Sequence, residues 1–198
     1  MVYVDGFNLY YGVLKGTPYK WLNIDALVKN LLTNNEIIGI KYFTAPVTDR
    51  RRLKNQKIYI CALQTMIPYF ECIFGYFQEK RSDMRHLNPP PNKVQVLVSE
   101  EKGTDVNIAV EIVNDIHTKD FDSVLLISND GDLERSLNIA KQKGKKIILI
   151  SPLMNKKARP AHKLVKIADH VYFLKIPNIL KKSLLPKSVG IYTCPSHW

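Results

Sequence analysis

Aspartate residues stand where predicted strands end, and their carboxylates are the side chains in this sequence best suited to chemistry. Asp5 follows a short apolar stretch at the start of the chain, and Asp130 and Asp132 follow a second one. Asp105 opens a helical pattern that lies between them in the sequence. Ligands of open α/β sheets bind outside the carboxyl ends of the strands, so we expect these four acids to meet at one edge. The alternative is that each acid only caps or begins a helix, where Asp is common.

The stretch S-V-L-L-I-S-N-D-G-D-L, from Ser123 to Leu133, shows the pattern most clearly. Its consecutive apolar residues at 124–127 predict a strand buried in the middle of a parallel sheet. A helix is predicted to follow and to run to about residue 143. The start of the chain repeats this order, with a strand at 2–4, then Asp5, then a helical turn. The recurrence favours a shared site over isolated helix caps.

Strands and helices alternate along the rest of the chain. Strands are predicted at residues 2–4, 37–45, 70–78, 94–98, 124–127, 147–150 and 171–174. Segments with apolar residues at helical spacing lie between most of them. This alternation indicates a three-layer, Rossmann-like α/β fold with a mostly parallel central sheet, whose first strand lies near the centre.

Two segments depart from the alternation. Residues 80–93 are basic and rich in proline, and they predict a long loop of the kind that is usually functional or disordered. The strand at 94–98 would pair as a hairpin with the strand at 70–78. Toward the end of the chain the pattern weakens, so residues 1–176 are predicted to form the domain and residues 177–198 a basic tail or small appendage.

The chain is strongly basic, because 29 Lys and Arg residues against 18 Asp and Glu residues give a net charge of +11. Such an excess favours a polyanionic partner, although a basic protein without one is the alternative. Basic residues cluster at 50–57 and 156–166, and the first cluster crowds a helix start, where the helix dipole disfavours cations. We therefore predict phosphate contacts rather than only a solvated helix face. The candidate contacts in these clusters are Arg50, Arg51, Arg52, Lys156, Lys157 and Arg159.

Several familiar kinds of site are absent from the sequence. No G-x-G-x-x-G follows a strand, no G-x-x-x-x-G-K-[ST] occurs, and neither G-x-S-x-G nor a His beside the acids supports acyl transfer. The three cysteines are far apart, which argues against a disulfide framework or a zinc site. No apolar run approaches the roughly 20 residues of a membrane helix. Met1 leads directly into a predicted strand, so we expect a cytoplasmic protein without a membrane partner.

Four carboxylates at one edge would repel each other and would need a cation. Hard oxygen ligands suit Mg²⁺ or Mn²⁺, and the D-G-D sequence at 130–132 lacks the later bidentate Glu of a calcium loop. Ions held by carboxylates can activate water and stabilise the leaving oxygen of a phosphodiester. With a basic surface beside such a site, the sequence indicates a metal-dependent nuclease.

Three motifs carry a resemblance to a known family. They are V-D-G-F-N-L-Y at 4–10, E-K-G-T-D-V-N-I-A-V-E at 101–111 and L-I-S-N-D-G-D-L at 126–133. In order and spacing they resemble the signatures of NYN domains, the LabA-like branch of the PIN-like nucleases, over roughly residues 1–176. The resemblance implies a PIN-like fold, a Mg²⁺ or Mn²⁺ site and cleavage of RNA.

On that pattern, the resemblance assigns roles to individual residues. The catalytic and metal-holding acids would be Asp5, Asp105, Asp130 and Asp132. Asn8 would orient water or phosphate, and Lys102 would approach a phosphate. Glu111 falls where similar domains often have an acid, but it lies six residues past Asp105 and therefore off the helical face of that residue.

The third motif departs from the commoner S-G-D-S-D-F of the family. Asn129 replaces the Gly, Gly131 replaces the second Ser, and Leu133 replaces the Phe. Both acids of the motif are retained, whereas a small hydroxyl group is lost at position 131. The departure therefore affects fine positioning more than metal binding.

The leading hypothesis is a metal-dependent endoribonuclease with RNA as its partner. Single-stranded RNA is favoured by four aromatic residues that could stack on bases, although at least two of them are expected in the core. They are Tyr10, Tyr11, Tyr19 and Trp21. The alternatives are a nucleic-acid-binding module with little turnover and a metal-dependent nucleotide phosphohydrolase. The sequence leaves the oligomeric state open, a homodimer included.

Overall fold

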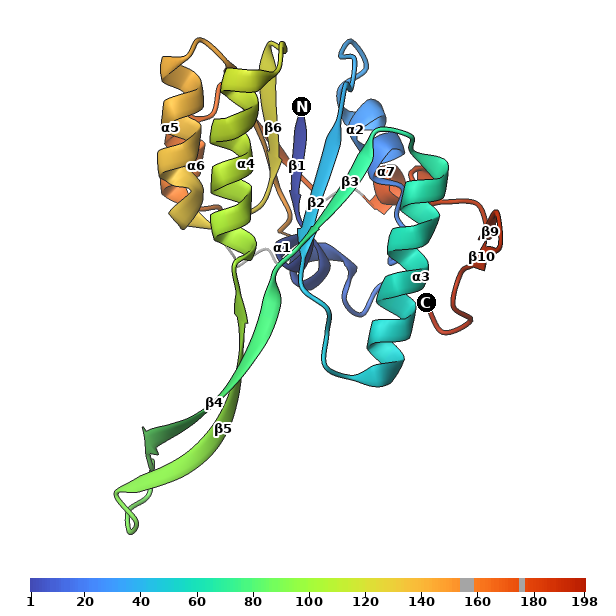
Figure 1. Ribbon diagram of the computed structural model, residues 1–198. Coiled ribbons are helices and arrows are strands. Elements are labelled where there is room, and N and C mark those ends of the chain that lie inside the picture. The colour runs from blue at the N-terminus through green and yellow to red at the C-terminus, as the bar shows by residue number, and fades with distance from the viewer. Residues whose placement is uncertain (154–158, 175–176) are drawn as a thin grey trace.

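A six-stranded parallel sheet forms the centre of the protein (Figure 1). The computed structural model describes residues 1–153, 159–174 and 177–198. The sheet has the strand order β3-β2-β1-β6-β7-β8. Its strands are β1 (Val2–Asp5), β2 (Ile40–Thr44), β3 (Phe70–Phe74), β6 (Ser123–Ile127), β7 (Lys146–Ser151) and β8 (His170–Phe173). The predicted α/β class, the parallel sheet and the central place of the first strand are confirmed.

Helices cover both faces of the sheet and make three layers (Figure 1). Their bounds are α1 (Gly6–Leu9), the π-helical turn η1 (Tyr10–Leu14), α2 (Ile24–Leu31), α3 (Arg50–Met66), α4 (Thr104–Thr118), the short turn η2 (Gly131–Leu133), α5 (Glu134–Gln142), α6 (His162–Ile167) and α7 (Pro177–Lys182). Side chains alternate along a strand, so Val4 packs with α2 and α3 on one face, while Tyr3 packs with α4 on the other. Burial on both faces explains why the strands are apolar without a polar alternation.

The order of the strands reverses at the centre of the sheet. From β1 the chain moves outward through β2 and β3, then returns to place β6 on the other side of β1. Val4 is paired with Ile127, so the ends of β1 and β6 lie side by side. In doubly wound sheets such a reversal of direction marks the ligand-binding crevice. The predicted edge is therefore the region outside these two strand ends, at Asp5 and Ser128, which we call the crevice.

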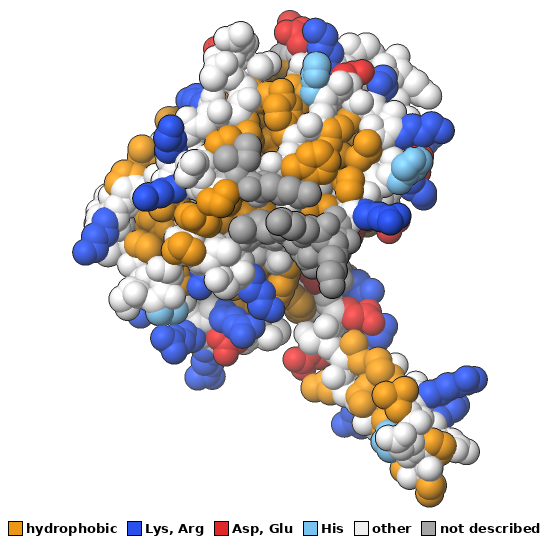
Figure 2. Space-filling view, turned by 180° about the vertical axis from the view of Figure 1, so that it is seen from behind, with side chains coloured by type: hydrophobic (Ala, Val, Ile, Leu, Met, Phe, Trp, Pro, Cys, Tyr) orange, Lys and Arg blue, Asp and Glu red, His pale blue; other side chains and the backbone are white. Residues whose placement is uncertain are grey.

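A long two-stranded arm projects from the body of the molecule (Figures 1 and 2). It consists of β4 (Tyr76–Arg85) and β5 (Lys93–Lys102), which pair antiparallel along their whole length. The prediction of a loop at residues 80–93 was wrong, because only residues 86–92 connect the strands. β4 is polar and exposed over most of its length and lacks the pattern by which strands are recognised, whereas β5 keeps this alternation at Val94, Val96 and Val98.

The segment at 177–198 packs against the helices α2 and α3. It contains α7 and the short strands β9 (Ser188–Val189) and β10 (Tyr192–Thr193). Leu180 and Leu185 are buried in the same core as β1, and the indole of Trp21 donates a hydrogen bond to the carbonyl of Pro186 at 2.7 Å. The division of the chain at residue 176 stays a prediction.

Within the described residues, no helix is both long enough and apolar enough to cross a membrane.

Candidate active site

Asp5 ends β1 and is held in one orientation by its neighbours. Its side chain is 2% exposed. One carboxylate oxygen accepts a hydrogen bond from the backbone N–H of Asn8 at 2.9 Å, and the other accepts from the Asn8 amide at 2.6 Å and the Ser128 hydroxyl at 3.0 Å. Burial raises the pKa of the Asp5 carboxyl, and these hydrogen bonds act in the opposite direction. Asn8 therefore holds the Asp5 carboxylate in its orientation.

The glycine after Asp5 allows α1 to start against the neighbouring strand. A Cβ atom on Gly6 would lie 2.7 Å from the carbonyl oxygen of Phe43 and 2.7 Å from the ring of Tyr42. Neither group can move easily, because both belong to the buried strand β2. The Gly in the V-D-G-F-N motif is thus required by close packing at the strand end.

The end of β6 presents the second group of acids. The buried hydroxyl of Ser128 donates to Asp5 and accepts from the backbone N–H of Asp130 at 3.1 Å. Asp130 in turn accepts from the backbone N–H of Asp132 at 2.9 Å and so caps the turn η2. The capping role proposed as the alternative for Asp130 is therefore present, in a residue that also lies at the crevice. Asp132 is exposed beside it.

Asn129 connects three strand ends through its side chain and backbone. Its backbone N–H donates to the Asn8 side chain at 3.2 Å. Its amide oxygen accepts from the backbone N–H of Ala161 at 2.7 Å and from the hydroxyl of Ser151 at 3.3 Å. A Gly at this position would make none of the side-chain contacts. The departure from the family motif thus supplies a cross-link between β6, β7 and the start of α6.

Asp105 reaches the same edge from the first turn of α4. Gly103 has a φ of 89°, which favours glycine and turns the chain from the arm into this helix. The pKa of Asp105 is raised to about 6, first by burial and then by the negative charges of neighbouring acids. These neighbours are Asp130, Asp5, Glu101 and Asp132. The four predicted acids therefore share one electrostatic environment.

Glu101 is a fifth acid at this edge, and sequence reasoning did not single it out. Its carboxylate accepts from the backbone N–H of Thr104 at 3.1 Å and also from the Thr104 hydroxyl. It contributes to the raised pKa of Asp105. The available signal was its position in the second motif, three residues before the start of α4.

The acids suit a hard divalent cation in charge and in donor type. None of the four predicted acids forms an ion pair with any residue that the structure describes. The negative charges of Asp5, Asp130 and Asp132 raise the pKa of Asp105, a cation would offset this repulsion, and oxygen donors match Mg²⁺ and Mn²⁺. In the described side-chain positions, however, no three acidic, His or Cys side chains are close enough to share one ion. The donor set thus fits the metal, and ligation requires the side chains to move closer together.

Glu111 belongs to a different group of charges. Its carboxylate pairs with Lys41 of β2, whose ammonium also lies 2.7 Å from Asp115. Asp115 accepts a further hydrogen bond from the hydroxyl of Tyr3 at 3.0 Å. This buried network joins α4 to the sheet. Glu111 therefore has a structural partner and lies apart from the acids that surround Asp105.

The predicted basic contacts are divided among several places. Arg52 lines a hollow beside α1, whereas Arg50 lines a different one, and Arg51 is exposed. Lys102 forms an ion pair with Glu100 at 2.9 Å on the arm. Arg159 is exposed, and its carbonyl accepts from Asn129.

Lys156 and Lys157 lie outside the described residues. Lys163 from the same basic run is closer to the acids, because its side chain passes beside Gly131 and reaches Glu134 at 3.4 Å.

Comparison with known proteins matches the chain to a family. The model of the NYN domain matches residues 1–176. Among curated proteins, the 6-hydroxy-3-succinoylpyridine 3-monooxygenase HspA of Pseudomonas putida (strain DSM 28022 / S16) is 31% identical over 170 residues. That alignment covers 71% of this chain and 54% of the relative, so this chain spans about half the length of the protein it matches. Because the family match includes all three motifs and most of the sequence, the chain belongs to the NYN domain family of PIN-like nucleases.

Proposed function

We propose that this protein is a metal-dependent endoribonuclease that hydrolyses RNA phosphodiester bonds at the crevice between β1 and β6. Family membership indicates a nuclease-type function, and NYN nucleases generally depend on divalent metal ions. The observation that carries the proposal is the gathering of Asp5, Asp105, Asp130 and Asp132, without ion-pair partners among the described residues, where the sheet reverses direction. Neutral or paired acids would instead indicate a structural role.

The proposed mechanism assigns a task to each residue at the crevice. The four aspartates would hold Mg²⁺ or Mn²⁺, which when bound activates water and stabilises charge on the leaving oxygen. Asn8 and Ser128 fix the orientation of the Asp5 carboxylate. Protonation of Asp105 near pH 6 competes with cation binding, so affinity for the metal falls as the pH decreases.

Basic residues beside the crevice support a polymeric substrate. Arg159 and Lys163 are exposed near the end of β6, and Lys156 and Lys157 lie in the same stretch of sequence. A nucleotide needs one or two cations, whereas a basic surface around the site favours a polyanion that extends beyond it. We therefore favour RNA hydrolysis over nucleotide hydrolysis.

Cleavage assays with labelled substrates test this function. Purified protein is incubated with single-stranded RNA, single-stranded DNA and duplex DNA, with Mn²⁺, Mg²⁺ or chelator. RNA is expected to be cut internally only when a metal is present, and Asp130→Asn is expected to remove this activity. Asp120→Asn is the matched control, because it removes an equal charge from an exposed residue two positions past the end of α4. Binding without cleavage would indicate a binding module, and release of phosphate from nucleotides alone would indicate a phosphohydrolase.

RNA binding is expected to weaken steeply as salt rises. Each phosphate neutralised on a single strand contributes about −0.7 to the slope of log affinity against log salt, so three contacts give about −2. Fluorescence anisotropy of a labelled RNA in chelator, between about 50 and 300 mM KCl, measures this slope. A slope near zero would contradict the proposed polyanion surface.

The name of the matched relative adds a second candidate, the oxygenation of a hydroxypyridine. The observation that favours it is a hollow beside α1, which is lined by aromatic rings and contains Arg52. Such a hollow would accept an aromatic ring that carries a carboxylate. Oxygen uptake with 6-hydroxy-3-succinoylpyridine and a reduced nicotinamide would support this candidate, and we expect none above background.

A further inference from the structure

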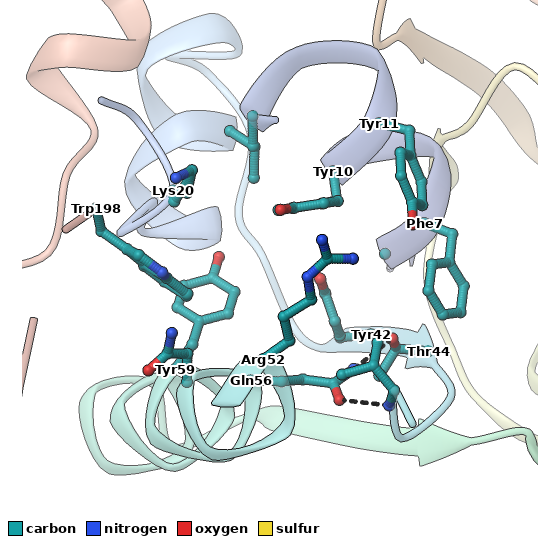
Figure 3. A pocket seen from close by; sticks show the side chains of 14 residues that line it. Phe7, Tyr10, Tyr11, Lys20, Tyr42, Thr44, Arg52, Gln56, Tyr59 and Trp198 are labelled. Carbon is teal, nitrogen blue, oxygen red and sulfur yellow. Dashed lines mark hydrogen bonds between the residues drawn. The ribbon is translucent and has the colours of Figure 1, made fainter. Parts of the chain in front are cut away.

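A pocket of about 120 Å³ lies beside α1 (Figure 3). Gly6 and Phe7, which directly follow Asp5, form part of its wall. Five further aromatic rings, from four parts of the chain, also line the pocket. These rings belong to Tyr10, Tyr11, Tyr42, Tyr59 and Trp198. The pocket and the acids are therefore joined through α1.

Arg52 supplies positive charge inside this aromatic wall. It extends from the first turn of α3 across the pocket toward Tyr10, with Trp198 and Tyr59 on one side and Phe7 and Tyr11 on the other (Figure 3). Its guanidinium forms no hydrogen bond or ion pair with any residue that the structure describes. Among the residues that the structure describes, no Asp or Glu lines the pocket. The pocket therefore favours an anionic ligand.

The walls of the pocket are held in place before any ligand binds. The side chain of Gln56 donates to the carbonyl of Ala45 at 2.9 Å and to the hydroxyl of Thr44 at 3.1 Å, which fixes α3 against the end of β2. The hydroxyl of Tyr59 donates to the carbonyl of Leu22 at 2.8 Å. The ring of Trp198 lies 5.8 Å from that of Tyr59. A rigid aromatic wall loses little conformational entropy when a planar ring binds.

We propose that this pocket binds one unpaired nucleobase of the RNA beside the bond that is cut, with Arg52 on the adjacent phosphate. A nucleotide combines a flat ring with an anion, and every base has a π-face that stacks on aromatic side chains. The volume admits one ring system, and a base inside a duplex is not available to enter. This inference rests on the proposed function, and it adds a preference for single-stranded RNA and a base preference near the cut.

Helical spacing on α3 provides a matched control. Arg52, Gln56 and Tyr59 lie on the face that borders the pocket, whereas Arg50 lines a separate hollow with Lys57. Arg50→Ala and Arg52→Ala remove the same charge from the same helical turn. Both side chains are exposed, and the capping bond at this turn uses the backbone N–H of residue 52, so each variant is expected to fold.

The test measures binding in chelator, so that it does not depend on cleavage. The probes are adenosine 5′-monophosphate, adenosine, nicotinate, a single-stranded RNA octamer and its duplex. The chain has two tryptophans, of which Trp198 lines the pocket and Trp21 is buried with its ring 6.1 Å from that of Trp198, so quenching of tryptophan fluorescence reports occupation of the pocket. Calorimetry provides an independent affinity. Thermal melts confirm that each variant is folded.

We expect the monophosphate to bind more tightly than adenosine or nicotinate, and the single strand more tightly than the duplex. Arg52→Ala is expected to weaken binding of the monophosphate at least 10-fold, whereas Arg50→Ala is expected to leave its affinity within about 2-fold of the wild type. Tyr10→Ala is also expected to weaken binding of the monophosphate. Tyr76 is an exposed tyrosine on the arm, and Tyr76→Ala is expected to leave this binding unchanged. Tighter binding of nicotinate, equal binding of duplex and single strand, or equal losses in the two arginine variants would overturn the proposal.

The cleavage pattern separates this inference from the function on which it rests. With Mn²⁺, Arg52→Ala is expected to cut RNA with an altered base preference beside the cut. An unchanged pattern together with no binding of the monophosphate would remove the pocket proposal and leave the nuclease intact. Binding of the monophosphate by a wild-type protein that cuts no RNA would support the pocket and overturn the nuclease.

Discussion

Asp105→Asn is expected to lower the rate of RNA cleavage roughly 100-fold or more and to raise the melting temperature of the metal-free protein at pH 8. The loss of activity follows because the variant removes one of the four acids proposed to hold the cation. The gain in stability follows because a carboxylate that other acids repel is replaced by a neutral amide of the same shape. Functional sites commonly trade stability in this way.

The sign of the stability change depends on pH. The pKa of Asp105 rises from an ordinary 3.8 to about 6 in the folded protein, so ionisation is less favourable there than in the unfolded chain. The wild type therefore loses stability as the pH rises from about 4 through 6, and the variant does not. A shift of two units corresponds to at most about 3 kcal/mol, and half-exposure reduces this to about 1 kcal/mol, or about 2–4 °C in the melting temperature.

Thermal melts at pH 4 and pH 8, each with chelator and with Mn²⁺, measure this prediction beside a cleavage assay. At pH 4 with chelator the two proteins are expected to melt alike. At pH 8, Mn²⁺ is expected to raise the melting temperature of the wild type more than that of Asp105→Asn, because the metal stabilises most the native protein that binds it more tightly. Asp120→Asn is expected to match the wild type in both assays. An active Asp105→Asn protein would contradict the proposed site.

Lys41→Ala is expected to reduce the free energy of unfolding by about 3 kcal/mol without changing the activity of the folded protein. Lys41 is 5% exposed, and it pairs with Glu111 and with the fully buried Asp115. Loss of the ammonium leaves Asp115 with Lys119 and the hydroxyl of Tyr3 as its remaining partners. A buried charge that loses a partner is costly because water cannot replace it.

Urea unfolding measures this loss, and Glu111→Gln is the companion variant. Glu111 is more exposed than Asp115. Glu111→Gln is therefore expected to reduce the free energy of unfolding by less than Lys41→Ala does. Cleavage by folded Glu111→Gln protein is expected to equal that of the wild type. A folded but inactive Glu111→Gln variant would show that this acid belongs to the site, contrary to its pairing in the structure.

The sequence by itself determined the class of the fold and the edge that carries the acids. Apolar runs such as 124–127, closed by Asp and Gly, indicate buried parallel strands, and the carboxyl ends of parallel strands point the same way. Asp5 and Asp130 therefore had to lie on one edge of any such sheet. The helical phase of Glu111 likewise separated it from Asp105 before its partner was known.

Only the tertiary structure decided which distant residues meet. The arm was predicted only in part, because β5 keeps an apolar alternation at Val94, Val96 and Val98, whereas β4 is polar and exposed over most of its length, although the two strands pair fully. Lys41 forms an ion pair with Glu111, which is distant in sequence. Arg52 lines one pocket together with Tyr10 and Trp198, which are also distant in sequence. Such contacts depend on strand order and helix packing, and local residue patterns contain no information about either. The acid edge is thus a property of local sequence, whereas the pocket beside it is a property of the folded chain.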